Sequence, residues 1–283
     1  MLTLFDPTEA RHFCGAFANS RGQSEGEAEV FLRQFGIGRQ ISEGTSVFDE
    51  VRDCLLRDAE RLLFLGLSNY RRAFDLLLPS ACGWAQVTLY YSGYFAASAL
   101  LAMFGARTYW RRPYPLAIQV DTGRPGSQVL KVVNTRPMST YRGSHQRFWD
   151  LFYASVSTLV PSIDPPLRIA VTPVSNNPTW LIEERNAVNY ESRIWYQAME
   201  DFQVSFRRSN LRSSLPGALS TQFEITEGLL RVSCGFGRTL GLTSDALMNV
   251  LPEAARSVRI RSLIYDASSA TLGNQARRRG LIL

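Results

Sequence analysis

Lysine, histidine and closely spaced cysteines are scarce in this chain of 283 residues. Its 31 basic residues include one lysine, Lys131, and its two histidines are His12 and His145. The four cysteines, at positions 14, 54, 82 and 234, are far apart and form no CxxC pair. This pattern argues against a zinc site, a disulfide framework and metal catalysis through histidine ligands. We therefore expect no metal, no cofactor and cysteines that are buried thiols.

The chain also has no apolar run long enough to cross a membrane, because Ser, Gly or a charged residue interrupts each one. Its first residues lack the basic start and apolar segment of a secretory signal. The composition, 45% hydrophobic and 20% charged, is that of an ordinary globular protein. We expect a compact cytoplasmic protein with no membrane partner.

The positive charge is carried almost entirely by arginine, and the formal net charge is +6. Planar guanidinium groups match phosphate oxygens well, so this balance favours a nucleic-acid partner. The alternative is that high arginine and low lysine reflect genome composition. No GxSxG elbow or phosphate-binding loop is present, and GFGRTLG at 235–241 lacks the spacing of one.

Four segments have the apolar periodicity of helices. Residues 46–78 predict one long amphipathic helix with a break near Gly66 and an end at Pro79. Residues 80–105 are apolar on most sides and rich in Ala, which predicts a helix at the centre of a bundle. Two more segments, 144–160 and 178–206, complete a four-helix bundle, so the predicted fold class is mainly α.

Three parts of the chain lie outside these helices. Residues 116–120 and 128–133 flank the turn DTGRPGS, which predicts a β-hairpin inserted in the bundle near 116–133. Residues 1–45 predict an N-terminal segment packed on the bundle of residues 46–208. Residues 209–283 mix Gly, Ser and Pro with short helical pieces, and they predict a C-terminal helical extension.

The segment most suggestive of chemistry is the polar run within the fourth predicted helix. Arg185 and Asn189 stand one turn apart, and Asn186 and Tyr190 form the neighbouring row, so all four share one broad face. Arg185 suits a phosphate, Asn186 a phosphate or ribose hydroxyl, and Tyr190 a base. The bland alternative is that Arg185 pairs with Glu183, Glu184 or a carboxylate of the first helix.

This polar face lacks a group that accepts protons near neutral pH. His145, at the start of the third predicted helix, is the candidate for that acid or base. Its alternative role is that of an ordinary surface residue near a helix end. The sequence does not place His145 near Arg185.

Three of these segments resemble the HEPN superfamily of helical-bundle proteins. The run WAQVTLYYSGYFAASALLAMFG is similar to a HEPN segment in which an aromatic pair and small residues precede an apolar run and a glycine. RGSHQRFWDLF is similar to the helix that follows, and ERNAVNYESRIWYQAMEDF resembles the signature helix. The resemblance covers roughly residues 47–206 and implies a HEPN-like helical bundle.

Many HEPN proteins are dimeric, metal-independent endoribonucleases with an Arg, a polar residue and a His four to six residues further on. The resemblance assigns Arg185, Asn186 and Tyr190 to these places, with Tyr190 where the histidine is expected. An ordinary tyrosine, with a pKa near 10, is a poor base at pH 7. The resemblance therefore implies an RNA-directed homodimer of a prokaryotic stress, toxin-like or antiviral defence system. It leaves open an endoribonuclease, a non-catalytic binding module and a scaffold that holds partner proteins of the same system.

Overall fold

The protein is mainly helical, as the sequence predicts. The computed structural model describes residues 1–20, 28–76, 81–110, 114–121, 127–159, 177–191 and 217–239. Within these ranges the helices are α1 Pro7–Ser20, α2 Ala28–Gln34, α3 Ser46–Asp75, α4 Cys82–Met103, α5 Ser144–Val156, α7 Trp180–Tyr190 and α9 Gly217–Thr239. The strands are β1 Gln40–Ser42, β2 Arg107–Tyr109, β3 Leu116–Val120 and β4 Val129–Asn134, and a 3₁₀ turn spans Arg136–Met138.

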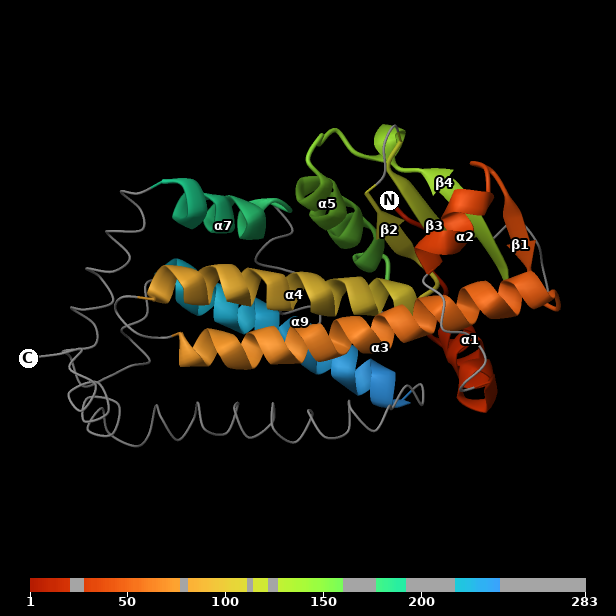
Figure 1. Cartoon of the computed structure of the whole chain (residues 1–283), viewed down its shortest axis with the longest axis horizontal. Coiled ribbons are helices and arrows are strands. Elements are labelled where there is room, and N and C mark those ends of the chain that lie inside the picture. Colours follow the sequence, from red (N-terminus) through yellow and green to blue (C-terminus); the bar gives the residue numbers. More distant parts are fainter. Residues whose placement is uncertain are drawn as a thin grey trace, which may run out of the picture.

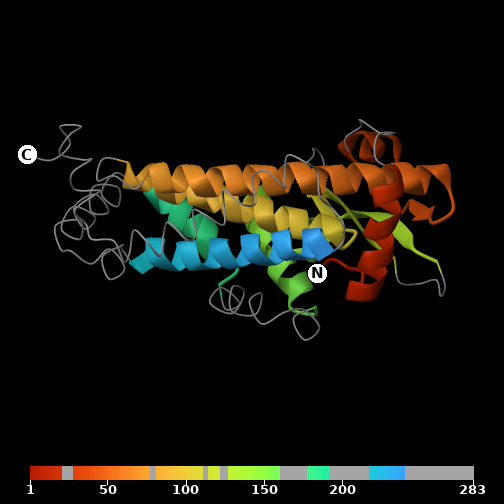
Figure 2. The same cartoon turned by 90° about the horizontal axis from the view of Figure 1, so that it is seen from below.

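Helix α4 is the central element of the bundle. It packs against α3, α9 and α7, and most of its residues are buried. The long helices α3, α4 and α9 lie side by side, while α7 and α5 cover another side of α4 (Figures 1 and 2). A helix enclosed in this way has no polar face, which explains why its sequence is apolar on most sides. The predicted central position of this segment is confirmed.

Helix α3 passes through Gly66 without the predicted break. A side chain at Gly66 would lie 3.3 Å from the carbonyl oxygen of Ser92 and 3.2 Å from Leu230 Cδ2. The Ser92 hydroxyl also donates a 2.6 Å hydrogen bond to the Gly66 carbonyl oxygen. This glycine therefore permits three helices to approach closely, and it does not interrupt the helix.

The end of α4 is set by Gly105, whose φ of +79° is a conformation that favours glycine. Its backbone N–H donates to the Ala102 carbonyl oxygen at 3.1 Å, and that of Ala106 donates to Leu101 at 2.9 Å. These bonds satisfy carbonyl groups that the helix end would leave unpaired. The predicted boundary at this glycine agrees with the structure.

The predicted hairpin is part of a larger antiparallel sheet with the strand order β1-β4-β3-β2. The strands β3 and β4 pair as predicted, with Ile118 opposite Val132. The strands β1 and β2 were not predicted, because three residues are too few to show an alternating pattern. Buried side chains, including Ile118, Val120, Leu130 and Val132, belong to the same apolar core as the helices.

Helix α9 lies within the predicted C-terminal extension, yet it is a full member of the bundle. It runs along α4 (Figures 1 and 2) and buries Leu219, Phe223, Leu229 and Leu230. Ser233 donates a 2.9 Å hydrogen bond to the carbonyl oxygen of Ala96 on α4. The sequence did not predict this helix as one continuous element, because it contains several glycines and glycine is a poor helix former.

Helix α7 is shorter than the predicted helix of residues 178–206, since it ends at Tyr190 and Glu191 has extended backbone angles. Residues 192–206 lie outside the described ranges, as do Pro79 and the part of the extension after residue 239. Of the helices in the described ranges, not one combines the length and apolarity needed to span a bilayer.

Each of four helices carries one buried cysteine. Cys14 lies on α1, Cys54 on α3, Cys82 on α4 and Cys234 on α9, and all four are free thiols. Burial raises the pKa of both Cys14 and Cys234 to about 12. These thiols therefore serve as small apolar core residues in the folded protein.

Candidate functional site

Two of the sequence-predicted site residues meet on the ring of a tyrosine in the central helix. The guanidinium carbon of Arg185, on α7, lies 5.1 Å from the ring centroid of Tyr90 and 5.8 Å from that of Tyr91. The Nδ1 atom of His145, on α5, lies 2.8 Å from the Tyr90 hydroxyl oxygen. The structure thus brings Arg185 and His145 to one site on α4.

The spacing of aromatic residues on α4 explains this convergence. Tyr90 and Tyr94 are one turn apart and face the same side of the helix. The His145 ring lies against both, with centroid distances of 5.7 Å to Tyr90 and 4.7 Å to Tyr94. Tyr91 contacts the same imidazole at 6.1 Å. These tyrosines form an aromatic floor beneath the two polar side chains, and we call this arrangement the Arg185–His145 site.

Arg185 is buried, with 9% of its surface exposed, and no carboxylate pairs with it in the described part of the chain. Glu183 accepts hydrogen bonds from Thr179 and Asn177 at the start of α7. Glu184 lies 3.5 Å from the side-chain amide of Gln86. The bland alternative, in which Arg185 pairs with one of these neighbours, is therefore not what the structure shows.

The Nε–H of Arg185 is a buried donor without an acceptor among the described residues. A buried charge ordinarily has a partner, because the loss of hydration costs several kcal/mol. The faces of Tyr90 and Tyr91 compensate part of this cost through cation–π attraction. The site therefore keeps the capacity to attract an anion.

His145 is uncharged at neutral pH in this environment. Burial, and then the positive charge of Arg185, lower its pKa to about 4. Burial also raises the pKa of Tyr90, so its hydroxyl keeps the proton. The Trp149 indole N–H donates to the Tyr90 oxygen at 3.3 Å.

The direction of the bond between Tyr90 and His145 follows from the tautomer of the imidazole. With the proton on Nδ1, His145 donates to the Tyr90 oxygen, and Nε2 is free to accept a proton. With the proton on Nε2, Tyr90 donates to Nδ1, and Nε2 is a donor. In both tautomers Nε2 has no hydrogen-bond partner among the described residues.

The other two predicted site residues are not part of this cluster within one protomer. Asn186 is partly buried, and Tyr190 is 76% exposed at the end of α7. Five residues of helix turn the chain by about 140° relative to Arg185. Tyr190 therefore faces solvent, away from the buried guanidinium.

Sequence reasoning missed the aromatic partners Tyr90, Tyr91 and Trp149. Their segments were interpreted as bundle core and, through the HEPN resemblance, as family segments, but no site role was given to these three residues, because aromatic residues at helical spacing are most often core residues. A signal was present, since a tyrosine or tryptophan buried in a helix needs a partner for its O–H or N–H.

No family model, no curated protein and no solved structure matches the chain. Within the described ranges, no group of three or more His, Cys, Asp or Glu side chains is placed to hold a metal ion.

Proposed function

We propose that this chain is a HEPN-like, RNA-directed protein that cleaves RNA without a metal at the Arg185–His145 site. The observation that carries the proposal is a buried guanidinium without a carboxylate partner, next to an uncharged imidazole. The arginine-rich composition and the net charge of +6 favour a polyanionic partner. The HEPN resemblance suggests a cytoplasmic setting in prokaryotic defence or stress.

The proposed reaction is attack of a ribose 2′-oxygen on the adjacent phosphorus, which breaks the bond to the leaving 5′-oxygen and gives a 2′,3′-cyclic phosphate. With its own proton on Nδ1, in a hydrogen bond to the Tyr90 oxygen, His145 takes the 2′-hydroxyl proton on Nε2 and then gives it to the leaving 5′-oxygen. Arg185 stabilises the additional negative charge of the pentacovalent transition state.

The proposal gives Asn186 and Tyr190 supporting roles. Asn186 orients a ribose or phosphate oxygen, and the exposed Tyr190 contacts a base or a second copy of the chain. A homodimer through α7 would place Tyr190 of one protomer close to its partner, as the HEPN resemblance implies. The 76% exposure of this large side chain supports such a contact.

The test is incubation of the purified protein with total RNA in EDTA, followed by mapping of the ends. We expect cyclic phosphate ends from the wild type and a loss of at least a hundredfold in rate for Arg185→Met and His145→Gln. Methionine keeps an unbranched side chain over Tyr90 and leaves no carboxylate unpaired. Arg11→Ala, which removes an exposed arginine of α1, is the matched control and should cleave normally.

Cleavage that persists in both Arg185→Met and His145→Gln would contradict the assignment of this site. Intact RNA in every sample would favour the second candidate, a non-catalytic binding module or scaffold. The tautomer with the proton on Nε2 would favour that candidate, since it leaves His145 as a donor rather than a base. RNA retention that falls steeply with salt and depends on Arg185 would support binding. RNA retention that is the same in Arg185→Met and in the wild type would indicate the scaffold.

A further inference from the structure

A second buried arginine has no negative partner among the described residues. Arg147, on α5, has 7% of its surface exposed, and no ion pair holds it within the described residues. Its Nη2 donates to the carbonyl oxygen of Tyr141 at 2.8 Å. Its Nε and Nη1 atoms are buried donors without acceptors.

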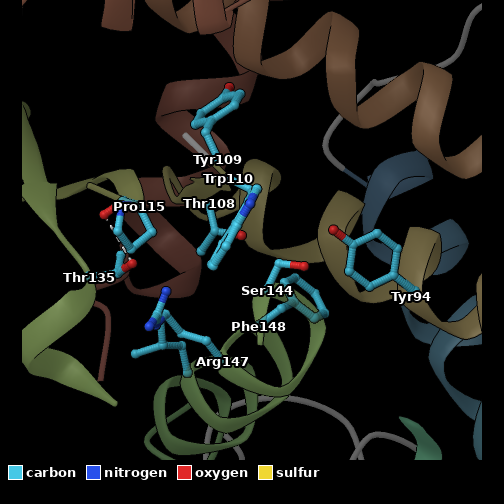
Figure 3. Close-up of a pocket in the computed structure, with 10 residues that line it drawn as sticks. Tyr94, Thr108, Tyr109, Trp110, Pro115, Thr135, Ser144, Arg147 and Phe148 are labelled. Carbon is cyan, nitrogen blue, oxygen red and sulfur yellow. Dashed lines mark hydrogen bonds between the residues drawn. The ribbon is translucent and has the colours of Figure 1, made fainter. Parts of the chain in front are cut away.

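Arg147 lines a cavity of about 40 Å³ between α5 and the sheet. Among the described residues of this lining, Arg147 is the one charged side chain and none is acidic. Figure 3 shows the Arg147 guanidinium between Trp110 and Thr108 on one side and Pro115 and Thr135 on the other. Ser144, the first residue of α5, also lines the cavity.

The cavity is large enough for a small oxyanion. A cavity needs about 10–15 Å³ to hold one water, so this space accommodates about three to four waters, which is close to the number of oxygens of one tetrahedral anion. The hydroxyl of Thr135 donates to Pro115 O at 3.2 Å and is therefore already engaged. Arg147 is therefore the one charged donor of the described lining, and guanidinium groups suit phosphate oxygens.

The rim of the cavity carries a large exposed aromatic ring. Trp110 is 55% exposed, and its ring centroid lies 5.5 Å from the guanidinium carbon of Arg147. An indole held beside a phosphate-binding group offers a face on which a nucleobase can stack. The pocket thus combines a buried anion-binding end with an open aromatic edge.

We propose that the Arg147 pocket binds the phosphate of a nucleoside monophosphate, either a free nucleotide or the phosphorylated end of an RNA, with its base against Trp110. This function is separate from the Arg185–His145 site, since it needs neither Arg185 nor His145 and involves no cleavage. Tyr94 is the wall that the two sites share, because it lines the pocket and lies against His145.

The test measures the binding of AMP, inorganic phosphate and adenosine to the full chain by calorimetry. We expect AMP to bind about tenfold more tightly than inorganic phosphate, because stacking adds affinity, and adenosine not to bind measurably. Arg147→Met should weaken AMP binding at least tenfold, and Trp110→Ala should remove the advantage of AMP over phosphate. Arg142→Met, at an exposed arginine of the preceding loop, should bind AMP as the wild type does.

Two RNA arms identify the source of the phosphate. Tighter binding of a 5′-phosphorylated oligonucleotide than of its 5′-hydroxyl form would assign the pocket to RNA ends. Binding of AMP with no such difference would assign it to the free nucleotide. Equal binding of AMP and adenosine, or AMP binding unchanged in both Arg147→Met and Arg147→Lys, would overturn the proposal.

The outcome is independent of the proposed cleavage. Arg185→Met should leave AMP binding unchanged, and Arg147→Met should leave cleavage of a 5′-hydroxyl RNA unchanged. If Arg185→Met loses only cleavage and Arg147→Met loses only AMP binding, the two proposals are tested separately.

Discussion

Buried arginines in this protein are of two kinds. Arg52 is paired twice, with its guanidinium 2.7 Å from Asp49 and 2.9 Å from the equally buried Asp53. Arg147 and Arg185 have aromatic rings beside them and no carboxylate among the described residues. Since burial of an unpaired charge opposes folding, these two positions agree with the anion binding that we propose for them.

This contrast predicts opposite effects of the same substitution. Arg52→Met should lower the free energy of unfolding by about 3 kcal/mol, because it leaves the buried Asp53 without its cation. Arg147→Met should leave stability unchanged or raise it by about 1 kcal/mol, because it removes an unpaired buried charge. Urea denaturation of both variants measures the difference. An equal loss in the two would mean that Arg147 has a structural role comparable to that of Arg52.

His145 predicts a specific dependence of stability on pH. Its folded pKa of about 4 lies below the ordinary value of 6.5, so between these two values the unfolded chain binds a proton that the folded chain does not. Stability should therefore fall as the pH falls from about 6.5 to 4, by about 2 kcal/mol after allowance for partial exposure of the ring. Above pH 7 His145 causes no such loss of stability, because it is uncharged in both the folded and the unfolded chain.

Subtraction of the profile of His145→Gln from that of the wild type isolates this contribution. His12→Gln is the matched control, because His12 is exposed and lies on α1 away from this site. A wild-type profile that matches that of His145→Gln between pH 4 and 6.5 would contradict the low pKa of His145.

The helices differ in how strongly the sequence predicts them. Residues with strong apolar periodicity, as in α3 and α5, are predictable because packing on one face imposes that period. Helix α9 and the strands β1 and β2 were missed, since glycines interrupt the first and the strands have three residues each. These elements form through tertiary contacts, which a local pattern does not record.

Gly66 allows a test of helix packing at the level of elements. Alanine in an open helical position should add about 0.5–1 kcal/mol of stability, and Gly15 on α1, with nothing within 4 Å of an added Cβ, is such a position. Gly66→Ala should lack this gain and destabilise by about 1 kcal/mol, because the new Cβ meets the Ser92 carbonyl oxygen. Thermal denaturation compares the variants. A gain at Gly66 equal to that at Gly15 would mean that the helices are not in close contact.

The whole molecule is built around α4, and the site follows from that arrangement. The sequence named Arg185 and His145 as candidates, but their meeting at Tyr90 depends on how α5 and α7 lie across the central helix. No local pattern encodes the relative placement of two helices. The pocket beside Arg147 was not predictable for the same reason, because its lining comes from α4, α5 and three strands or their flanking residues.

Helix α9 provides the prediction at the scale of the molecule. Phe223 is 1% exposed, and its ring centroid lies 6.1 Å from that of Tyr70 on α3. Phe223→Ala should therefore destabilise the whole bundle by about 3–4 kcal/mol, whereas Glu224→Ala, at the adjacent exposed position, should change stability by less than about 0.5 kcal/mol. The measurement is chemical denaturation followed by circular dichroism. An unchanged midpoint for Phe223→Ala would show that α9 is an independent extension.

The four buried thiols can report when individual helices of the bundle open. Because α1, α3, α4 and α9 each carry one free cysteine, every one of these helices has its own reporter of exposure. A thiol reagent modifies each cysteine only when its helix opens, since all four thiols are buried, and burial also raises the pKa of Cys14 and Cys234. Mass-spectrometric timing of the four modifications would therefore order the opening of the bundle helix by helix, without the introduction of a single label.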